Sequence, residues 1–174
     1  MNIEGRENIP EGPVIIAPNH TSILDAPMLL SITRRKIRSM GKAELFQNKL
    51  LGGILRAAGA FPVHRGTNDI TAIKTALRTL KDGGVFAIFP TGTRVKSGEA
   101  AEAKSGVALI AAKSGAPIIP VAICNGYRAF RKVTIRIGEP MYIKNENGVK
   151  PSGDELAIYA DLVLAKINAL GDAQ

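Results

Sequence analysis

Apolar residues gather along the chain in four short, nearly continuous runs that are rich in valine and isoleucine. The runs cover residues 14–17, 61–65, 85–89 and 118–123. Runs of this length and composition are typical of strands that are buried on both faces of a sheet. The sequence therefore predicts a set of buried strands.

Between the runs, apolar residues return at the spacing of an α-helix. Residues 68–82 carry an apolar face opposite a basic one, and a pair of glycines ends the pattern. Further helices are predicted over 101–114 and 153–170. Because strands alternate with helices, we expect an α/β fold, a single layered domain over residues 1–174 in which helices flank a central, mostly parallel sheet.

Two segments fit this scheme less simply. Residues 132–140 alternate apolar and polar positions and predict a half-exposed edge strand, which would give the sheet a mixed edge. Residues 34–56 combine several leucines with many basic side chains and one acidic residue, Glu44. We interpret them as a helix that either lies on an anionic membrane surface or packs in the core with a solvated basic edge.

The composition is that of a folded globular protein, with 45% hydrophobic and 22% charged residues among 174. Cys124 is the single cysteine, so an internal disulfide is excluded and a reducing, cytoplasmic location is expected. We interpret its thiol as a small buried group rather than a reactive one.

The net charge of +8 predicts an anionic partner: nucleic acid, an acidic membrane surface, a phosphorylated metabolite or an acidic carrier protein. Aromatic residues make up 5% of the chain and tryptophan is absent, which argues against nucleic acid bound by base stacking. No apolar run approaches the roughly 20 residues of a membrane span, and residues 1–13 do not resemble a signal peptide. We expect a protein that is soluble or attached to a membrane surface.

Polar residues follow three of the predicted strands directly. His20 comes after the first strand, Arg65 ends the second, and the loop at 90–94 follows the third. Ligands gather at the carboxyl ends of parallel strands because backbone amides and helix N-termini converge there. We therefore expect the three segments to share one site.

His20 precedes Asp25 by five residues, and two interpretations of this pair remain open. Ser22 and Asp25 have the spacing of a helix capping box, which would make the stretch a structural turn. Alternatively, the turn brings His20 and Asp25 together, so that the carboxylate orients the imidazole for general-base chemistry. On a regular helix the two side chains would lie on different faces.

Four blocks of the sequence resemble the glycerophospholipid acyltransferases typified by 1-acylglycerol-3-phosphate acyltransferase. "NHTSILD" resembles the first block of that family, "GAFPVHRG" the second, "FPTGTR" the third and "APIIPVAI" the fourth. Order and spacing agree from about residue 4 to residue 140. The resemblance implies a glycerol-3-phosphate acyltransferase-like fold and a catalytic pair formed by His20 and Asp25.

A phosphorylated acceptor needs cations and amide donors near the histidine. A guanidinium can bind phosphate oxygens at two points, and a glycine lets the backbone approach a ligand closely. For Arg94 and Lys104, a solvated surface charge remains the alternative, and His64 is interpreted as a bystander. The candidate substrate-binding residues are Arg65, Thr91, Gly92, Thr93, Arg94 and Lys104.

The implied activity is transfer of a fatty acyl group to the hydroxyl of a lysophospholipid. The acyl donor would be acyl-CoA or acyl carrier protein, and the expected acceptor is 1-acylglycerol 3-phosphate, which gives phosphatidic acid. No metal ion or bound cofactor is implied. We expect a cytoplasmic enzyme, peripherally attached to an anionic membrane surface and without a nucleic acid partner, and the sequence carries no signal for an oligomeric state.

Two departures from the family pattern leave alternatives open. Thr91 stands where the family usually has glutamate, and the chain starts close to the first block, without the hydrophobic N-terminal helices of many relatives. The threonine allows a different acceptor, such as glycerol 3-phosphate or a lyso-aminolipid. It also allows a non-catalytic lipid-binding module.

Overall fold

The four apolar runs all form strands of one seven-stranded sheet in the computed structural model. The model describes residues 1–64, 69–95, 102–124, 133–143 and 150–173. The strands are β1 (Asn2–Glu4), β2 (Val14–Pro18), β3 (Ile37–Lys42), β4 (Ala60–Val63), β5 (Val85–Ala87), β6 (Ile118–Cys124) and β7 (Thr134–Ile137).

The sheet is parallel through its centre and mixed at one side. The strand order is β1-β7-β6-β2-β5-β3-β4. Strands β2 to β6 run in one direction, whereas β7 pairs antiparallel with β6 and β1 pairs parallel with β7. The predicted α/β fold with a mostly parallel, mixed-edge sheet is confirmed.

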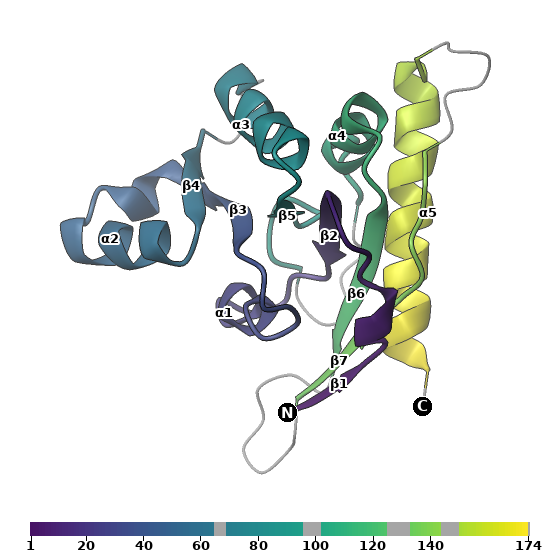
Figure 1. The fold of residues 1–174 in the computed structure, drawn as a ribbon, viewed down its shortest axis with the longest axis horizontal. Coiled ribbons are helices and arrows are strands. Elements are labelled where there is room, and N and C mark those ends of the chain that lie inside the picture. The colour runs from purple at the N-terminus through teal and green to yellow at the C-terminus, as the bar shows by residue number, and fades with distance from the viewer. Residues whose placement is uncertain (65–68, 96–101, 125–132, 144–149, 174) are drawn as a thin grey trace.

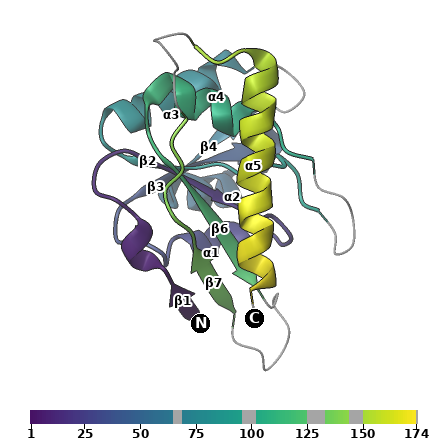
Figure 2. The ribbon, with the colours of Figure 1, turned by 90° about the vertical axis from the view of Figure 1, so that its right-hand side faces the viewer.

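Helices cover both faces of this sheet unequally (Figures 1 and 2). Three long helices, α3 (Ile70–Lys81), α4 (Gly106–Ser114) and α5 (Gly153–Asp172), lie on one face. The short helix α1 (Asp25–Leu29) lies on the other face. Helix α2 (Lys49–Ala57) and the 3₁₀ helix η2 (Ala43–Phe46) lie at the β4 end of the sheet, and a second 3₁₀ helix, η1 (Arg6–Asn8), follows β1.

Successive residues of β2 face opposite sides of the sheet and feed two separate cores. Ile15 belongs to the core under α3, α4 and α5, which also contains Phe86 and Ile118. Ile16 belongs to the core on the α1 side, together with Leu29. Because both faces are covered, β2 is apolar at every position, as the sequence pattern predicts.

The prediction of one helix over residues 34–56 is wrong. The segment contains β3, then η2, and only its last part is the α-helix α2. Strand β3 pairs with β5 on one side and β4 on the other, so it lies inside the sheet although Ile37 is its one buried side chain. A strand with so little apolar content gives no local signal, and its pairing with distant strands decides its conformation.

The prediction that residues 132–140 form an edge strand is also wrong. Strand β7 has the expected alternation of half-buried and buried side chains. However, β1 covers its outer side, with Ile3 opposite Ile135, so β1 is the edge. Strand β1 has three residues, too few for a periodic pattern to show in the sequence.

None of the helices in the described part of the chain combines the length and the apolar character needed to cross a membrane.

Candidate active site

The candidate site lies where the parallel strands β2 and β5 end. His20 follows β2 after one intervening residue, and the loop at 88–95 follows β5 directly. The two segments touch, since the amide of Val95 donates to the carbonyl oxygen of His20 at 2.9 Å. The first and third sequence blocks therefore meet at one edge of the sheet, as the prediction of a shared site requires.

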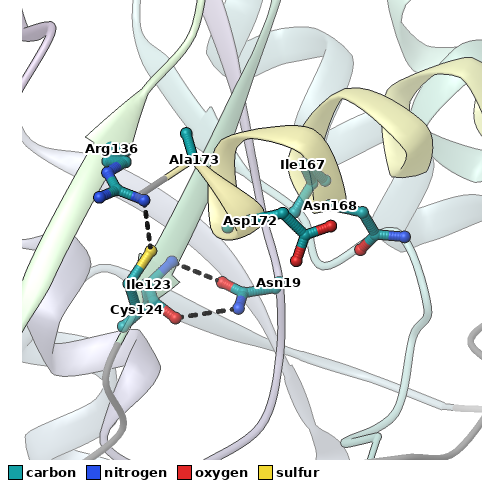
Figure 3. Close-up of a pocket in the computed structure, with 9 residues that line it drawn as sticks. Asn19, Ile123, Cys124, Arg136, Ile167, Asn168, Asp172 and Ala173 are labelled. Carbon is teal, nitrogen blue, oxygen red and sulfur yellow. Dashed lines mark hydrogen bonds between the residues drawn. The ribbon is translucent and has the colours of Figure 1, made fainter.

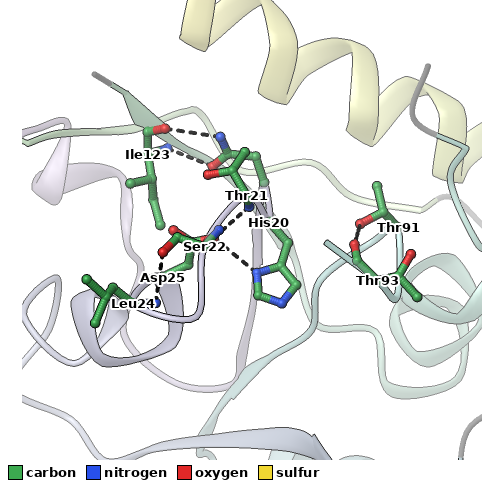
Figure 4. A network of polar contacts seen from close by, with 9 residues as sticks. His20, Thr21, Ser22, Leu24, Asp25, Thr91, Thr93 and Ile123 are labelled. Carbon is green, nitrogen blue, oxygen red and sulfur yellow. Dashed lines mark hydrogen bonds and ion pairs between the residues drawn. The ribbon is translucent and has the colours of Figure 1, made fainter. Parts of the chain in front are cut away.

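A tight turn brings His20 and Asp25 together (Figure 4). The Nδ1 atom of His20 lies 3.0 Å from Oδ2 of Asp25. The same oxygen accepts hydrogen bonds from the backbone amides of Thr21 and Ser22, each at 2.7 Å. Residues 21–24 do not form a regular α-helix, which is why a separation of five residues can be closed.

Asp25 makes the contacts that both interpretations of the sequence require. It is fully buried and is the first residue of α1. Its side chain accepts from the Ser22 amide, as in a capping box, but the Ser22 hydroxyl accepts from Leu24 rather than from Asp25. The three donors compensate for the loss of water around a buried carboxylate. One side chain thus both closes the turn and contacts the histidine.

The imidazole of His20 is contacted on one face of the ring as well as at Nδ1. It stacks on the ring of Phe89, with the ring centroids 3.9 Å apart and the planes inclined by 23°. The side chain of His20 keeps 13% exposure. An imidazole that is fixed at one nitrogen and one face, yet still reaches solvent, is suited to proton transfer with a bound substrate.

Asn19 anchors the residue before the histidine. Its side chain accepts from the amide of Ile123 at 2.8 Å and donates to the carbonyl oxygen of Ile123 at 3.1 Å. The backbone amide of Asn19 also donates to the carbonyl oxygen of Val121 at 3.2 Å. Asn19 therefore continues the pairing of β2 with β6 by one residue and positions the turn that carries His20.

The loop after β5 turns sharply at Gly92. This glycine has φ of 69°, in the left-handed region that favours glycine, and its amide donates to the carbonyl oxygen of Phe89 at 2.9 Å. The exposed Lys104 packs over it: a Cβ atom at position 92 would lie 3.1 Å from Cδ and 3.3 Å from Nζ of Lys104. The Lys104 amide also donates to the carbonyl oxygen of Pro90. The structure thus places a cationic amine on this loop.

Thr91 faces into the loop. Its side chain is buried, at 7% exposure, and its hydroxyl donates to the carbonyl oxygen of Thr93 at 2.7 Å. The hydroxyl hydrogen is therefore used inside the turn. Thr93 and Arg94 are exposed beside it.

Most of the residues singled out in the sequence meet at this edge, and one cannot be placed. His20, Asp25, Lys104 and the loop at 91–94 are connected by the contacts above, whereas Arg65 lies outside the described residues. The sequence analysis missed Phe89 as a partner of His20, although it begins the third block. It also missed the amides of Thr21 and Ser22, for which no side-chain pattern gives a signal.

A separate cavity of about 650 Å³ lies between the C-terminal end of α5 and the strands β6 and β7 (Figure 3). Cys124, Arg136 and Asp172 line it, and Asn19 borders it, but neither His20 nor Asp25 is among the described residues that form its wall. Arg136 is engaged there by Glu4 and by the carbonyl oxygen of Leu170. Burial raises the pKa of the Cys124 thiol, and nearby Arg136 opposes this less strongly. Cys124 is half-buried rather than buried as the sequence predicted, because it lines this cavity, and its raised pKa favours an unreactive thiol.

A family model described as Acyltransferase matches residues 1–124, which include His20, Asp25 and the loop after β5. The chain belongs to the acyltransferase family. It is an acyltransferase enzyme, and the resemblance seen in the four blocks is confirmed.

Individual relatives extend the similarity over nearly the whole chain. The chain is 33% identical to the 1-acyl-sn-glycerol-3-phosphate acyltransferase of Bacillus subtilis, over 98% of this chain and 87% of that protein. It is 32% identical to a chloroplastic enzyme of the same name from Arabidopsis thaliana, over 71% of this chain but 35% of that longer protein. The crystal structure of PlsC, the 1-acyl-sn-glycerophosphate acyltransferase from Thermotoga maritima, superposes with a TM-score of 0.75 at 28% identity, covering 99% of this chain and 73% of that one.

Proposed function

We propose that this acyltransferase moves a fatty acyl group from a thioester donor to the free hydroxyl of 1-acylglycerol 3-phosphate, giving phosphatidic acid. The observation that carries the proposal is the His20–Asp25 pair, held at 3.0 Å where β2 ends and beside the loop that follows β5. The names of the Bacillus and Thermotoga relatives support the acceptor. Acyl-CoA and acyl carrier protein both carry the required thioester.

In the proposed reaction His20 is the general base. With Nδ1 engaged by Asp25, the imidazole presents Nε2 to the substrate. Nε2 takes the proton of the acceptor hydroxyl while the hydroxyl oxygen attacks the thioester carbonyl carbon. The tetrahedral intermediate collapses as the carbon–sulfur bond breaks, and the imidazolium returns the proton to the leaving thiolate. The products are the ester and a free thiol.

Asp25 supports both states of the imidazole in this scheme. Its Oδ2 accepts from Nδ1 and so fixes the tautomer that leaves Nε2 as the base. The carboxylate also stabilises the positive charge that forms on His20 during attack. The amides of Thr21 and Ser22 hold Oδ2 in place, so the carboxylate is oriented before the substrate arrives.

Cationic groups beside the loop would hold the phosphate of the acceptor. Lys104 packs against Gly92 and, with the exposed Arg94, lies on the same loop that touches His20. Amide donors near Gly92 and the hydroxyl of Thr93 can add hydrogen bonds to phosphate oxygens. Arg65 is also proposed to bind the phosphate, on the basis of the sequence pattern alone.

The acceptor is a lipid, so the enzyme must act at a membrane surface. The net charge of +8 supports a peripheral attachment to anionic lipid on the cytoplasmic side.

Thr91 favours a second set of acceptors. It stands where the family usually has glutamate, so no carboxylate is available at this position to orient a cation or an acceptor hydroxyl. Glycerol 3-phosphate and lyso-aminolipids are therefore the alternative acceptors.

The proposal is tested by measuring thiol release from acyl-CoA and acyl carrier protein with each of these acceptors. We expect the highest kcat/KM with 1-acylglycerol 3-phosphate. His20→Ala is expected to lower turnover by about 10²- to 10⁴-fold, because it removes the general base. His64→Ala, which changes the other histidine, is the matched control and should keep the wild-type rate. Near wild-type turnover by purified, folded His20→Ala would refute the mechanism.

A further inference from the structure

Helix α2 is packed with its apolar side outward. Its one buried residue is Gly52, and a Cβ atom there would lie 2.8 Å from the carbonyl oxygen of Phe46, so the helix backbone rests directly on η2. Leu50 is 77% exposed, Ile54 59% and Leu51 41%. In an ordinary amphipathic helix these side chains would face the core. Within the part of the chain that the structure describes, the apolar face of α2 therefore has no partner.

This face has the features of a helix that lies in a membrane interface. Leu50 and Ile54 are one turn apart, so they form a single stripe together with Leu51. Leu45 in η2 is also exposed, at 39%, just before the helix. A cluster of exposed large apolar side chains on a soluble surface costs hydration free energy and marks an interaction site.

Two basic residues of α2 lie on the other side of the helix from the stripe: at helical spacing Lys49 and Arg56 fall on the Gly52 side, and the Arg56 guanidinium lies 5.4 Å from the centroid of the Phe46 ring. Lys49 begins α2 and Arg56 lies in its last turn, and both are exposed. Glu44, the one acidic residue between positions 34 and 56, is paired with Lys42 at 3.2 Å. The segment is therefore net positive, which favours an anionic lipid surface over a neutral one, and its apolar stripe fits the acyl region of such a surface.

The chain that leads to α2 leaves the sheet at the edge that carries the active site. Strands β2 and β3 both run parallel to β5, so the turn with His20 and the segment leading to α2 emerge at the same edge. Ile23 and Leu24, in the His20 turn, are 67% and 44% exposed. A bilayer bound through α2 would therefore lie next to the turn that holds the catalytic pair.

We infer that Leu45, Leu50, Leu51 and Ile54 form a docking surface that inserts into the interface of an anionic bilayer, while the net positive charge of the segment adds attraction to the lipid headgroups. The surface delivers the active site to a membrane-embedded acceptor. This last point rests on the proposed function, whereas the binding itself does not.

The test is co-sedimentation of the full chain with vesicles of phosphatidylglycerol and phosphatidylcholine, compared with phosphatidylcholine alone. The double variant Leu50→Ser/Ile54→Ser should bind the anionic vesicles at least about tenfold more weakly. Lys49→Gln should weaken binding by about fivefold, and added salt should reduce the difference. Leu50, Ile54 and Lys49 are exposed, so the variants should fold normally.

Helix α5 supplies a matched control. Ile158→Ser/Leu162→Ser changes two exposed apolar side chains with the same spacing, on a helix at the opposite end of the molecule from α2 (Figure 1). This variant should bind vesicles like the wild type. Equal binding by the α2 and α5 variants would overturn the inference, as would equal binding of the wild type to neutral vesicles. A dimer that only the α2 variant loses, with unchanged vesicle binding, would assign the face to a second copy of the chain instead.

Turnover separates this inference from the proposed function. Leu50→Ser/Ile54→Ser should lose activity with a vesicle-embedded acceptor and keep it with a short-chain, monomeric one. His20→Ala should bind vesicles normally and lose activity with both. A wild type that binds vesicles through α2 but acylates no acceptor would refute the proposed function and leave the docking surface intact.

Discussion

Asp25 shows how much one side chain can decide at the residue scale. A buried carboxylate with 0% exposure is costly, and Oδ2 of Asp25 meets that cost with three donors. Two of the donors are backbone amides of its own turn, and the third is His20. The structural role and the proposed catalytic role of Asp25 therefore rest on the same oxygen atom, and substitutions can separate them.

Asp25→Asn should lower turnover by at least about tenfold, though less than His20→Ala, while it keeps most of the stability. The amide oxygen can still accept from Thr21 and Ser22, but it cannot stabilise the imidazolium. Asp25→Ala leaves both amides without their acceptor and should also lower the free energy of unfolding by about 1–3 kcal/mol. Steady-state kinetics and urea unfolding of both variants provide the measurements. Normal turnover by Asp25→Asn with reduced stability would leave only the capping role.

Thr91→Val tests whether position 91 acts on the turn or on the substrate. Valine keeps the shape and removes the hydroxyl that donates to Thr93. We expect a loss of about 1 kcal/mol, seen as a melting temperature lower by about 2–4 °C, and an unchanged order of acceptors. A changed order of acceptors would show that the hydroxyl contacts substrate. Thr91→Glu in the same assays tests whether the residue usual in the family raises the rate with 1-acylglycerol 3-phosphate.

At the scale of elements, helix ends are set by polar side chains that the apolar pattern does not reveal. The pattern predicts a helix over 153–170, and α5 extends to Asp172. Its start is fixed by Ser152 and Glu155, which form a complete capping box: the Ser152 amide donates to the Glu155 carboxylate at 2.6 Å, and the Glu155 amide donates to the Ser152 hydroxyl at 3.2 Å. Helix α3 begins similarly, with Asp69 accepting from Ala72.

Glu155→Gln should make the stability of the protein less dependent on pH. The hydrogen bond from the Ser152 amide lowers the pKa of Glu155. A carboxyl whose pKa is lower in the folded state stabilises the fold above its unfolded pKa, about 4.3 for glutamate, and this contribution is lost as the pH falls through the folded value. The wild type should therefore exceed the variant in stability near pH 7, and the difference should vanish in more acidic solution. Unfolding at pH 3 to 7 measures it, with Asp161→Asn in the middle of α5 as the control.

At the scale of the whole molecule, Arg35 joins segments that are far apart in the sequence. Its guanidinium donates to the carbonyl oxygens of Pro10, Gly12 and Gly83. The first two precede β2 and the third precedes β5, so one side chain ties together the entries of two adjacent central strands. Although it belongs to the basic stretch at 34–56, Arg35 serves the fold rather than a membrane surface.

Arg35→Lys should lower the free energy of unfolding by about 1.5–3 kcal/mol, because an ammonium cannot reach three separate carbonyl groups as the planar guanidinium does. Arg34→Lys, at the exposed neighbouring position, is the control and should change stability by less than about 0.5 kcal/mol. Chemical denaturation measures both. Equal stability of the two variants would mean that the carbonyl groups are satisfied without Arg35.

The sequence by itself determined the features that depend on local pattern. Strands β2, β4, β5 and β6 coincide with the apolar runs to within two residues at their starts and ends or lie inside them, and α3, α4 and α5 likewise with the predicted helices, because burial on two faces or on one stripe dictates residue type at each position. The order of the four blocks likewise led to the acyltransferase family. The partnership of His20 with Asp25 needed only a turn of the right shape within one short segment.

Tertiary structure decided the rest, because it depends on pairing between distant segments. Strand β3 is a strand because β4 and β5 lie on either side of it, and β1 becomes the edge because β7 lies beside it. Phe89 stacks on His20 because β5 ends next to β2. The outward orientation of α2 is of the same kind: its sequence shows an apolar stripe, but only the contact of Gly52 with η2 shows that the stripe faces away from the core.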